Sequence, residues 1–146
     1  MNENYNIKGL AHICVYSRDI KKSIDFYTTI LDFTKVYNTT LIKDDGSGLQ
    51  CALLKFGTCL IELLAPDDHS SIPDGHSVVE HFALEVQGLE ALYATLKVKE
   101  IRFKTEIFQL PKLFKGGCKG FFIYGPEQEL IELFEYISET PFYDAP

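Results

Sequence analysis

Hydrophobic and polar positions alternate and then recur at helical spacing in the first half of the chain. Residues 10–16 alternate strictly, so His12 and the other even-numbered side chains share one face of a predicted strand. Apolar residues at helical spacing over 20–31 predict an amphipathic helix, which Asp19 is placed to cap. Further apolar runs predict three more strands, over 33–41, 50–56 and 59–64. The predicted order is β-α-β-β-β.

The second half repeats this order. Helical spacing of Leu89, Leu92, Tyr93 and Leu96 predicts the buried face of a helix. Strands are predicted around it, over 82–86, 101–107, 119–124 and 130–136. The connector over 65–77 is rich in Pro, Asp, Ser and Gly, as linkers are. The pattern predicts an α+β protein of two tandem βαβββ modules, residues 1–70 and residues 71–146, the second with a C-terminal tail.

Two His–Glu pairs mark the repeat. His12 precedes Glu62 by 50 positions, and His81 precedes Glu132 by 51. Each His opens an apolar strand-like run, and each Glu lies in an Ile-Glu-Leu frame. This is an internal repeat, so neither half needs a complete site of its own. If the halves pack about a pseudo-twofold axis, the two pairs converge into one four-ligand metal centre.

A bound metal ion accounts for the two carboxylates. A lone His in an apolar strand is usually structural, but Glu62 and Glu132 each interrupt an apolar strand, where an unpaired carboxylate is costly. The alternative is that both face solvent on edge strands. Two imidazoles and two carboxylates favour one borderline divalent ion, such as Ni²⁺, Co²⁺, Zn²⁺, Fe²⁺ or Mn²⁺. Such an ion eases removal of a proton beside a bound oxygen, with Glu132 or Glu62 as the catalytic base.

Composition narrows the classes of protein that remain. The chain is 46% hydrophobic and 24% charged, as soluble globular proteins are, and its net charge of −7 argues against a nucleic-acid surface. Four cysteines without a C-x-x-C motif and a polar start argue against a disulfide framework and secretion. We therefore expect reduced thiols and a cytoplasmic protein. No apolar run approaches the roughly 20 residues that span a bilayer, so no membrane contact is expected.

Four stretches resemble a known group of proteins. They are H-I-C-V-Y-S-R-D-I-K-K-S-I-D-F-Y, I-E-L-L-A-P, E-H-F-A-L-E-V and G-P-E-Q-E-L-I-E-L-F. Together, over residues 12–136, they look like the vicinal oxygen chelate superfamily, which holds the glyoxalases, bleomycin-resistance proteins and extradiol dioxygenases. The resemblance implies paired modules forming a cupped mixed sheet around a metal, and a homodimer. It also implies the ligand set of bacterial-type glyoxalase I (lactoylglutathione lyase) at His12, Glu62, His81 and Glu132.

The chain departs at three places from the sequence patterns of the families it resembles. Bacterial-type glyoxalase I usually has an Arg four residues after the first His and an Asn four residues after the first Glu, both of which hold glutathione; here Tyr16 and Pro66 stand there. The stretch over 57–66 looks equally like methylmalonyl-CoA epimerase, but the Gly-Ala-His-Gly-like stretch of that family is replaced over 111–117. The usual D-P-D-G turn before the last ligand lacks its glycine over 125–128.

The resemblance and the ligand set lead to one main function and three alternatives. The main expectation is a lyase or isomerase of the glyoxalase type, which moves a proton on a small α-oxo substrate through a metal-stabilised enediolate, with glutathione use in question. The alternatives are an epimerase that inverts a carbon beside a thioester, a metal-free antibiotic-sequestering module, and an extradiol dioxygenase, against which the fourth ligand Glu62 argues. Tyr16, Phe114 and Tyr124 are candidates to line the cup, or else core residues. The lysines over 112–119 are candidates to receive an anionic substrate tail, or else a solvated loop.

Overall fold

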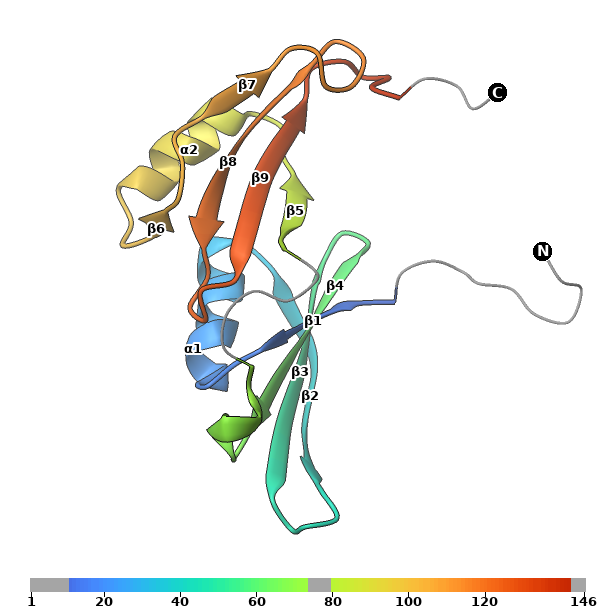
Figure 1. Ribbon diagram of the computed structural model, residues 1–146, viewed down its shortest axis with the longest axis vertical. Helices are drawn as coiled ribbons and strands as arrows, with labels where there is room; N and C mark the ends of the chain where they lie inside the picture. Colours follow the sequence, from blue (N-terminus) through green and yellow to red (C-terminus); the bar gives the residue numbers. More distant parts are fainter. Residues whose placement is uncertain (1–10, 74–79, 143–146) are drawn as a thin grey trace, which may run out of the picture. The chain divides into compact units, whose positions relative to one another are not determined.

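The computed structural model describes residues 11–73 and 80–142, which fall into two compact units (Figure 1). The first unit spans residues 1–73 and the second spans residues 74–146. Each unit contains its own mixed sheet with helical structure against one face. The predicted α+β class and the tandem βαβββ arrangement are confirmed.

The first unit is a four-stranded sheet in the order β1-β4-β3-β2. Strand β1 runs parallel to β4, and the remaining neighbours are antiparallel. Helix α1 continues directly into a π-helical segment, η1, and a short 3₁₀ turn, η2, follows the sheet. The elements are β1 (Ile13–Tyr16), α1 (Ile20–Asp25), η1 (Phe26–Ile30), β2 (Thr34–Ile42), β3 (Gly48–Phe56), β4 (Cys59–Pro66) and η2 (His69–Ser71).

The second unit repeats this topology with one strand divided. Its sheet has the order β5-β9-β8-β6, and β7 also pairs with β8. Strand β5 is parallel to β9, as β1 is to β4. The elements are β5 (Phe82–Glu85), α2 (Leu89–Lys97), β6 (Arg102–Phe103), β7 (Phe108–Leu110), β8 (Cys118–Tyr124) and β9 (Leu130–Tyr136).

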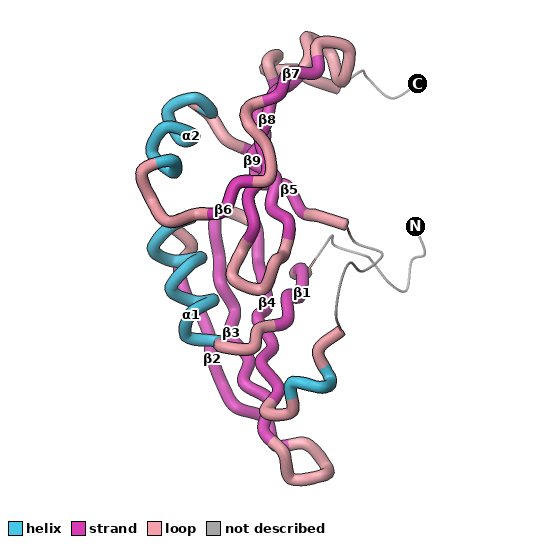
Figure 2. The backbone as a smooth tube through the Cα atoms, turned by 60° about the vertical axis from the view of Figure 1, so that its left-hand side comes forward, coloured by secondary structure: helices cyan, strands magenta, loops and turns pink. Residues whose placement is uncertain are grey.

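A helix lies against one face of each sheet, α1 in the first unit and α2 in the second (Figure 2). The core of each unit lies between them. Asp19 caps α1 as predicted, because its side chain accepts a hydrogen bond from the Lys22 amide. Every second residue along a strand points into the core. The residues between them point to the opposite face of the sheet, where other side chains can gather. Large, fully buried core side chains include Tyr27, Leu54, Ile61 and Leu63 in the first unit and Leu89, Leu96, Phe121, Ile123, Ile131 and Leu133 in the second.

Most predicted strands differ from the observed ones by one or two residues, but the predicted strand over 101–107 is broken. Only Arg102 and Phe103 of that range form a strand, β6, and the next strand on β8, β7, begins after it at Phe108. Between them the Phe122 amide donates to the Thr105 hydroxyl instead of to a strand carbonyl. A side chain therefore replaces a ladder bond, and the strand bends there. The predicted first strand begins only at Ile13, and Leu10 lies outside the described residues.

Two further expectations can be compared with the described residues. All four cysteines are free thiols, as predicted. Among residues 11–73 and 80–142, none of the helices combines the length and the apolar character that crossing a membrane requires.

Candidate metal centre

The first unit brings His12 and Glu62 together. In the parallel pairing of β1 with β4, Cys14 lies opposite Glu62. His12 is two residues before Cys14, so it shares the face of the sheet on which the Glu62 carboxylate stands. The His12 Nε2 and Glu62 Oε1 atoms are 3.6 Å apart. Residues 50 positions apart in the sequence are thus neighbours because of one strand register.

The second unit brings His81 and Glu132 together in the same way. Ala83 lies opposite Glu132 in the parallel pairing of β5 with β9, and His81 is two residues before Ala83. The His81 Nε2 and Glu132 Oε1 atoms are 3.9 Å apart. Both units therefore place a His–Glu pair at the same position of the same topology, with Nε2 facing Oε1 in each.

Both pairs lie on the sheet face opposite the helix. Residues next to the two glutamates in sequence, Ile61 and Ile131, point the other way and are at most 1% exposed. The Glu62 and Glu132 side chains themselves are 22% and 13% exposed. The carboxylates are thus largely withdrawn from water while remaining reachable from the site face.

A neighbouring carboxylate orients the His81 ring. The His81 Nδ1 atom is 2.9 Å from Glu80 Oε2. An ionised carboxylate can only accept, so Nδ1 carries the hydrogen and Nε2, in the neutral ring, keeps its lone pair on the side of Glu132. This is how metal-binding histidines are commonly held, with one ring nitrogen donating to a carboxylate and the other left for the ion.

The electrostatic surroundings of the ligands differ between the units. Burial raises the pKa of Glu132, with a smaller contribution from the Glu80 charge, while nearby His81 opposes the shift. In the first unit, burial and the charge of Glu62 raise the pKa of Cys14 to about 11. The same causes raise the pKa of Cys51, whose thiol contacts Glu62. Because burial disfavours the ionised form of Glu132, a cation beside that carboxylate would stabilise it.

The donor geometry of each pair fits a shared divalent ion. Nitrogen and oxygen ligands about 2.1 Å from a metal lie roughly 3 Å apart at adjacent positions. The observed separations of 3.6 and 3.9 Å exceed a hydrogen bond and need to shorten by less than 1 Å. Within residues 11–73 and 80–142, the structure shows no group of three His, Cys, Asp or Glu side chains arranged for a metal, so each unit supplies a pair. The joining of both pairs into one centre stays a prediction.

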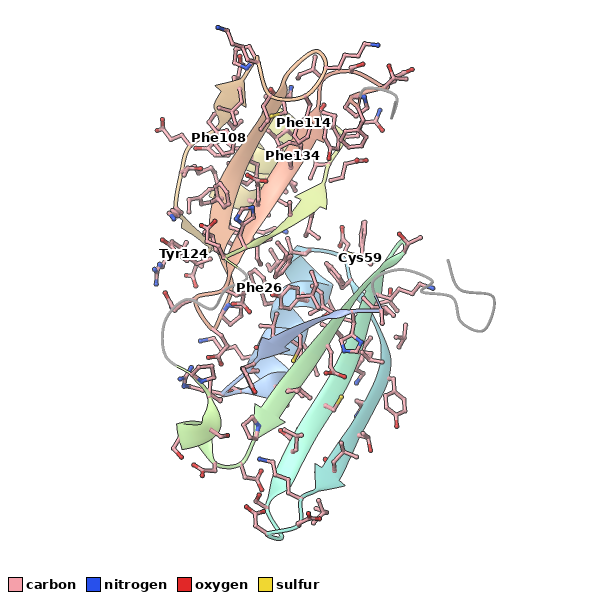
Figure 3. All side chains as sticks on the ribbon, turned by 45° about the vertical axis from the view of Figure 1, so that its right-hand side comes forward. Phe26, Cys59, Phe108, Phe114, Tyr124 and Phe134 are labelled. Carbon is pink, nitrogen blue, oxygen red and sulfur yellow. The ribbon has the colours of Figure 1, made fainter. Side chains whose placement is uncertain are left out.

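Aromatic side chains border the second pair. The Phe122 ring meets the His81 ring edge-on at 5.1 Å and stacks with Phe108 at 5.8 Å. Phe114, which has a positive φ of 62°, lies against Phe134 at 5.8 Å, as Figure 3 shows. The predicted lining residue Phe114 is thus on the site face of its sheet, packed against other aromatic rings.

The other residues predicted to line the cup or to bind a substrate tail are found in three different settings. Tyr16 lies on the site face of β1 and is 40% exposed. The Tyr124 ring packs under the Arg102 guanidinium at 4.4 Å. Lys119, a candidate to receive an anionic substrate tail, lies in β8 rather than in a solvated loop and forms an ion pair with Glu90 at 2.7 Å.

Sequence reasoning missed Cys51 and Glu80 as neighbours of the candidate ligands. Glu80 was visible as the residue before His81, but a contact between adjacent side chains has no sequence signature. Cys51 was within reach, because the two-residue Gly57–Thr58 loop pairs Phe56 with Cys59 and so fixes the register of the β3–β4 hairpin. Counting back along that hairpin places Leu53 opposite Glu62 and Cys51 two residues further on the same face.

Comparison with models of known protein families gave a match that covers most of the chain. Residues 9–133 match the family model described as "Glyoxalase/Bleomycin resistance protein/Dioxygenase superfamily". Comparison with curated protein sequences gave no match.

Three solved structures illustrate the likeness in fold. The trypanothione-dependent glyoxalase I of Leishmania major is 19% identical, with 88% of this chain and 87% of that chain covered and a TM-score of 0.69. The fosfomycin resistance protein FosX of Listeria monocytogenes is 17% identical, with 94% and 100% covered and a TM-score of 0.68. The lactoylglutathione lyase of Agrobacterium tumefaciens is 16% identical, with 90% and 96% covered and a TM-score of 0.62. At these identities the likeness establishes the fold.

Proposed function

Because the chain belongs to the glyoxalase/bleomycin resistance protein/dioxygenase superfamily, we propose that it is a metal-dependent lyase or isomerase of the glyoxalase type. The observation that carries this proposal is the repeated His–Glu pair. Each unit places Nε2 of its histidine within 4 Å of Oε1 of its glutamate, at the same strand register. A superfamily member without a metal has no need for two such pairs, because withdrawing two carboxylates from water is costly.

The four side chains have distinct roles in this proposal. His12, Glu62, His81 and Glu132 would hold one divalent ion of the borderline class, such as Ni²⁺, Co²⁺, Zn²⁺, Fe²⁺ or Mn²⁺. The ion would supply stabilisation of the negative charge that develops on a substrate oxygen.

Glu132 would act as the general base. Its carboxylate would take the proton from the carbon beside the substrate oxygen and return it to the adjacent carbon. Glu80 would keep His81 in the tautomer that presents Nε2. The site face would exclude bulk water through the aromatic side chains near His81.

Metal content tests the proposal directly. Protein purified without a chelator or a His-tag should carry or take up about one divalent ion per chain, and its thermal stability should rise on binding. The His12→Ala/His81→Ala double variant should lose that ion, whereas a His69→Ala variant, changed at an exposed histidine of η2, should keep it. Normal stoichiometry in the double variant contradicts the assignment. A wild-type chain that takes up no metal supports the alternative of a metal-free ligand-sequestering protein.

A further inference from the structure

The two oxygens of the Glu62 carboxylate have different partners. Oε1 lies 3.6 Å from His12 Nε2, on the side where an ion would bind. Oε2 accepts a hydrogen bond from the Cys51 thiol, with Sγ and Oε2 3.8 Å apart. Cys51 is a buried residue of β3, 8% exposed, so its thiol has little freedom to turn away. The carboxylate is therefore held in one orientation, with a single oxygen directed toward His12.

A second thiol lies on the other side of the same carboxylate. Cys14 is directly opposite Glu62 in the β1–β4 pairing, which places its thiol on the same face of the sheet as the carboxylate. A thiol is ordinarily protonated at neutral pH, so both side chains can serve as S–H donors. Glu62 thus lies between one donor from β1 and one from β3.

The second unit lacks these donors at the matching positions. Ala83 occupies the place of Cys14, opposite Glu132. Phe122 lies opposite Glu132 as Leu53 lies opposite Glu62, so the place of Cys51 is taken by Gly120. Neither Ala nor Gly has a side-chain donor. The topology of the two units is the same, and the thiols are one of the features that distinguish their glutamates.

We propose that Cys51 and Cys14 are positioning residues that fix Glu62 as a one-oxygen ligand of the ion. The inference rests on the proposed function, since it concerns how the metal centre is held. The proposal gives the two carboxylates different roles. Glu62, held on both sides, stays on the ion, while Glu132, without thiol donors, is free to move during proton transfer. Hydrogen bonds from groups behind a metal ligand commonly matter for metal affinity in this way.

The test is the metal affinity of variants at position 51. Cys51→Ala removes the donor, and we expect the dissociation constant for Co²⁺ or Ni²⁺, measured by competition with a chromophoric chelator, to rise roughly 10- to 100-fold. Cys51→Ser keeps a donor of similar size and should recover most of the affinity. Cys51→Val fills the space without donating, so it should bind as weakly as Cys51→Ala. Cys14→Ala should show the same direction of change.

Cys118→Ala is the matched control. Cys118 is also buried, 2% exposed, but its thiol donates to the backbone oxygen of Leu110. This variant should change the melting temperature of the metal-free protein and leave the metal affinity unchanged. If wild-type protein binds metal and both Cys51→Ala and Cys51→Val bind it equally well, the positioning role is overturned while the proposed function stands. If wild-type protein binds no metal, the proposed function itself fails.

Discussion

The two glutamates of the candidate centre are chemically identical side chains in different surroundings. Glu62 accepts a thiol hydrogen bond, whereas Glu132 is half-buried beside His81 with burial raising its pKa. A carboxyl group whose pKa is raised by burial binds its proton more tightly in the folded protein than in the unfolded chain. The role of each carboxylate is therefore set by the side chains that the neighbouring strands place beside it, and not by its being a glutamate.

The raised pKa gives a prediction for Glu132→Gln. The stability that protonated Glu132 contributes is complete below its ordinary pKa of 4.5 and is lost as the pH rises through the raised value. At neutral pH the ionised carboxylate therefore destabilises the folded, metal-free protein. Metal-free Glu132→Gln should therefore melt at a higher temperature than wild type at pH 7, with the difference shrinking toward pH 4, while its metal affinity falls. A variant that melts lower than wild type at pH 7 contradicts this.

Tyr16 and Pro66 give a prediction for the substrate. In bacterial-type glyoxalase I an Arg and an Asn at these places hold glutathione, and each charge-assisted bond is worth roughly 1.5 to 3 kcal/mol. The glutathione hemithioacetal of methylglyoxal should thus be a poor substrate, with kcat/KM lowered on the order of a hundredfold or more. Exchange of an α-proton for deuterium in another α-oxo or acyl-thioester compound should remain detectable by NMR.

A gain-of-function variant sharpens that prediction. Tyr16 is 40% exposed on the face that carries His12, so an Arg side chain has room there. Tyr16→Arg should raise kcat/KM for the glutathione adduct, whereas Tyr124→Arg, at a ring packed under Arg102, should not. Efficient isomerisation by wild type, at roughly 10⁵ M⁻¹s⁻¹ or above, would show that these two departures do not exclude glutathione.

Among the elements, α1 begins at an N-cap residue, Asp19, that the sequence pattern already predicts. The Asp19 carboxylate accepts from the Lys22 amide at 3.1 Å. Removing such a cap costs about 1 kcal/mol, so Asp19→Ala should lower the free energy of unfolding by that amount in urea denaturation. Asp25→Ala is the control, because Asp25 is an exposed aspartate of the same helix without a capping hydrogen bond. Equal losses in both variants would mean that the cap contributes nothing.

The hydrophobic pattern predicted most strands and which face of each is buried, but it did not predict where a strand or helix is locally interrupted. The apolar frame of Glu62 placed it correctly on β4, whereas His12 lies one residue before β1 begins at Ile13. The break after β6 depends on Thr105 replacing a ladder bond, which no periodicity records. The π-helical segment η1 likewise extends an ordinary amphipathic pattern. Side-chain substitution for backbone bonds is decided by tertiary contacts and is invisible in a one-dimensional pattern.

The candidate site was predictable to the extent that one strand pairing determines it. The near-constant His–Glu spacing predicted two pairs, and each unit brings its own pair within 4 Å. The thiol behind Glu62 and the carboxylate behind His81 required the register of a third strand and a side-chain torsion. The candidate ligands are therefore visible in the sequence, whereas Cys51 follows only from the register of the hairpin and the Glu80–His81 contact has no sequence signature.

For the whole molecule, an exposed sheet edge sets the expected assembly. Strand β2 is an edge of the first sheet, and nine residues long. Its side chains Val36, Tyr37, Leu41 and Ile42 are 50 to 71% exposed. A long apolar edge strand presents unpaired backbone N–H and C=O groups, so it tends to pair with another chain unless it is covered. We expect a second copy of the chain to cover it, because closed homodimers are the commonest assemblies of soluble proteins.

Light scattering tests this assembly. Wild-type protein should have the mass of a homodimer at micromolar concentration, and the Tyr37→Lys/Ile42→Lys variant should shift toward the monomer because two charges oppose each other across a twofold edge contact. Val98→Lys is the matched control, since Val98 is 86% exposed but lies outside both sheets. A wild-type monomer contradicts the dimer and excludes a site shared between subunits. A dimer that survives the charges on β2 places the interface on another surface.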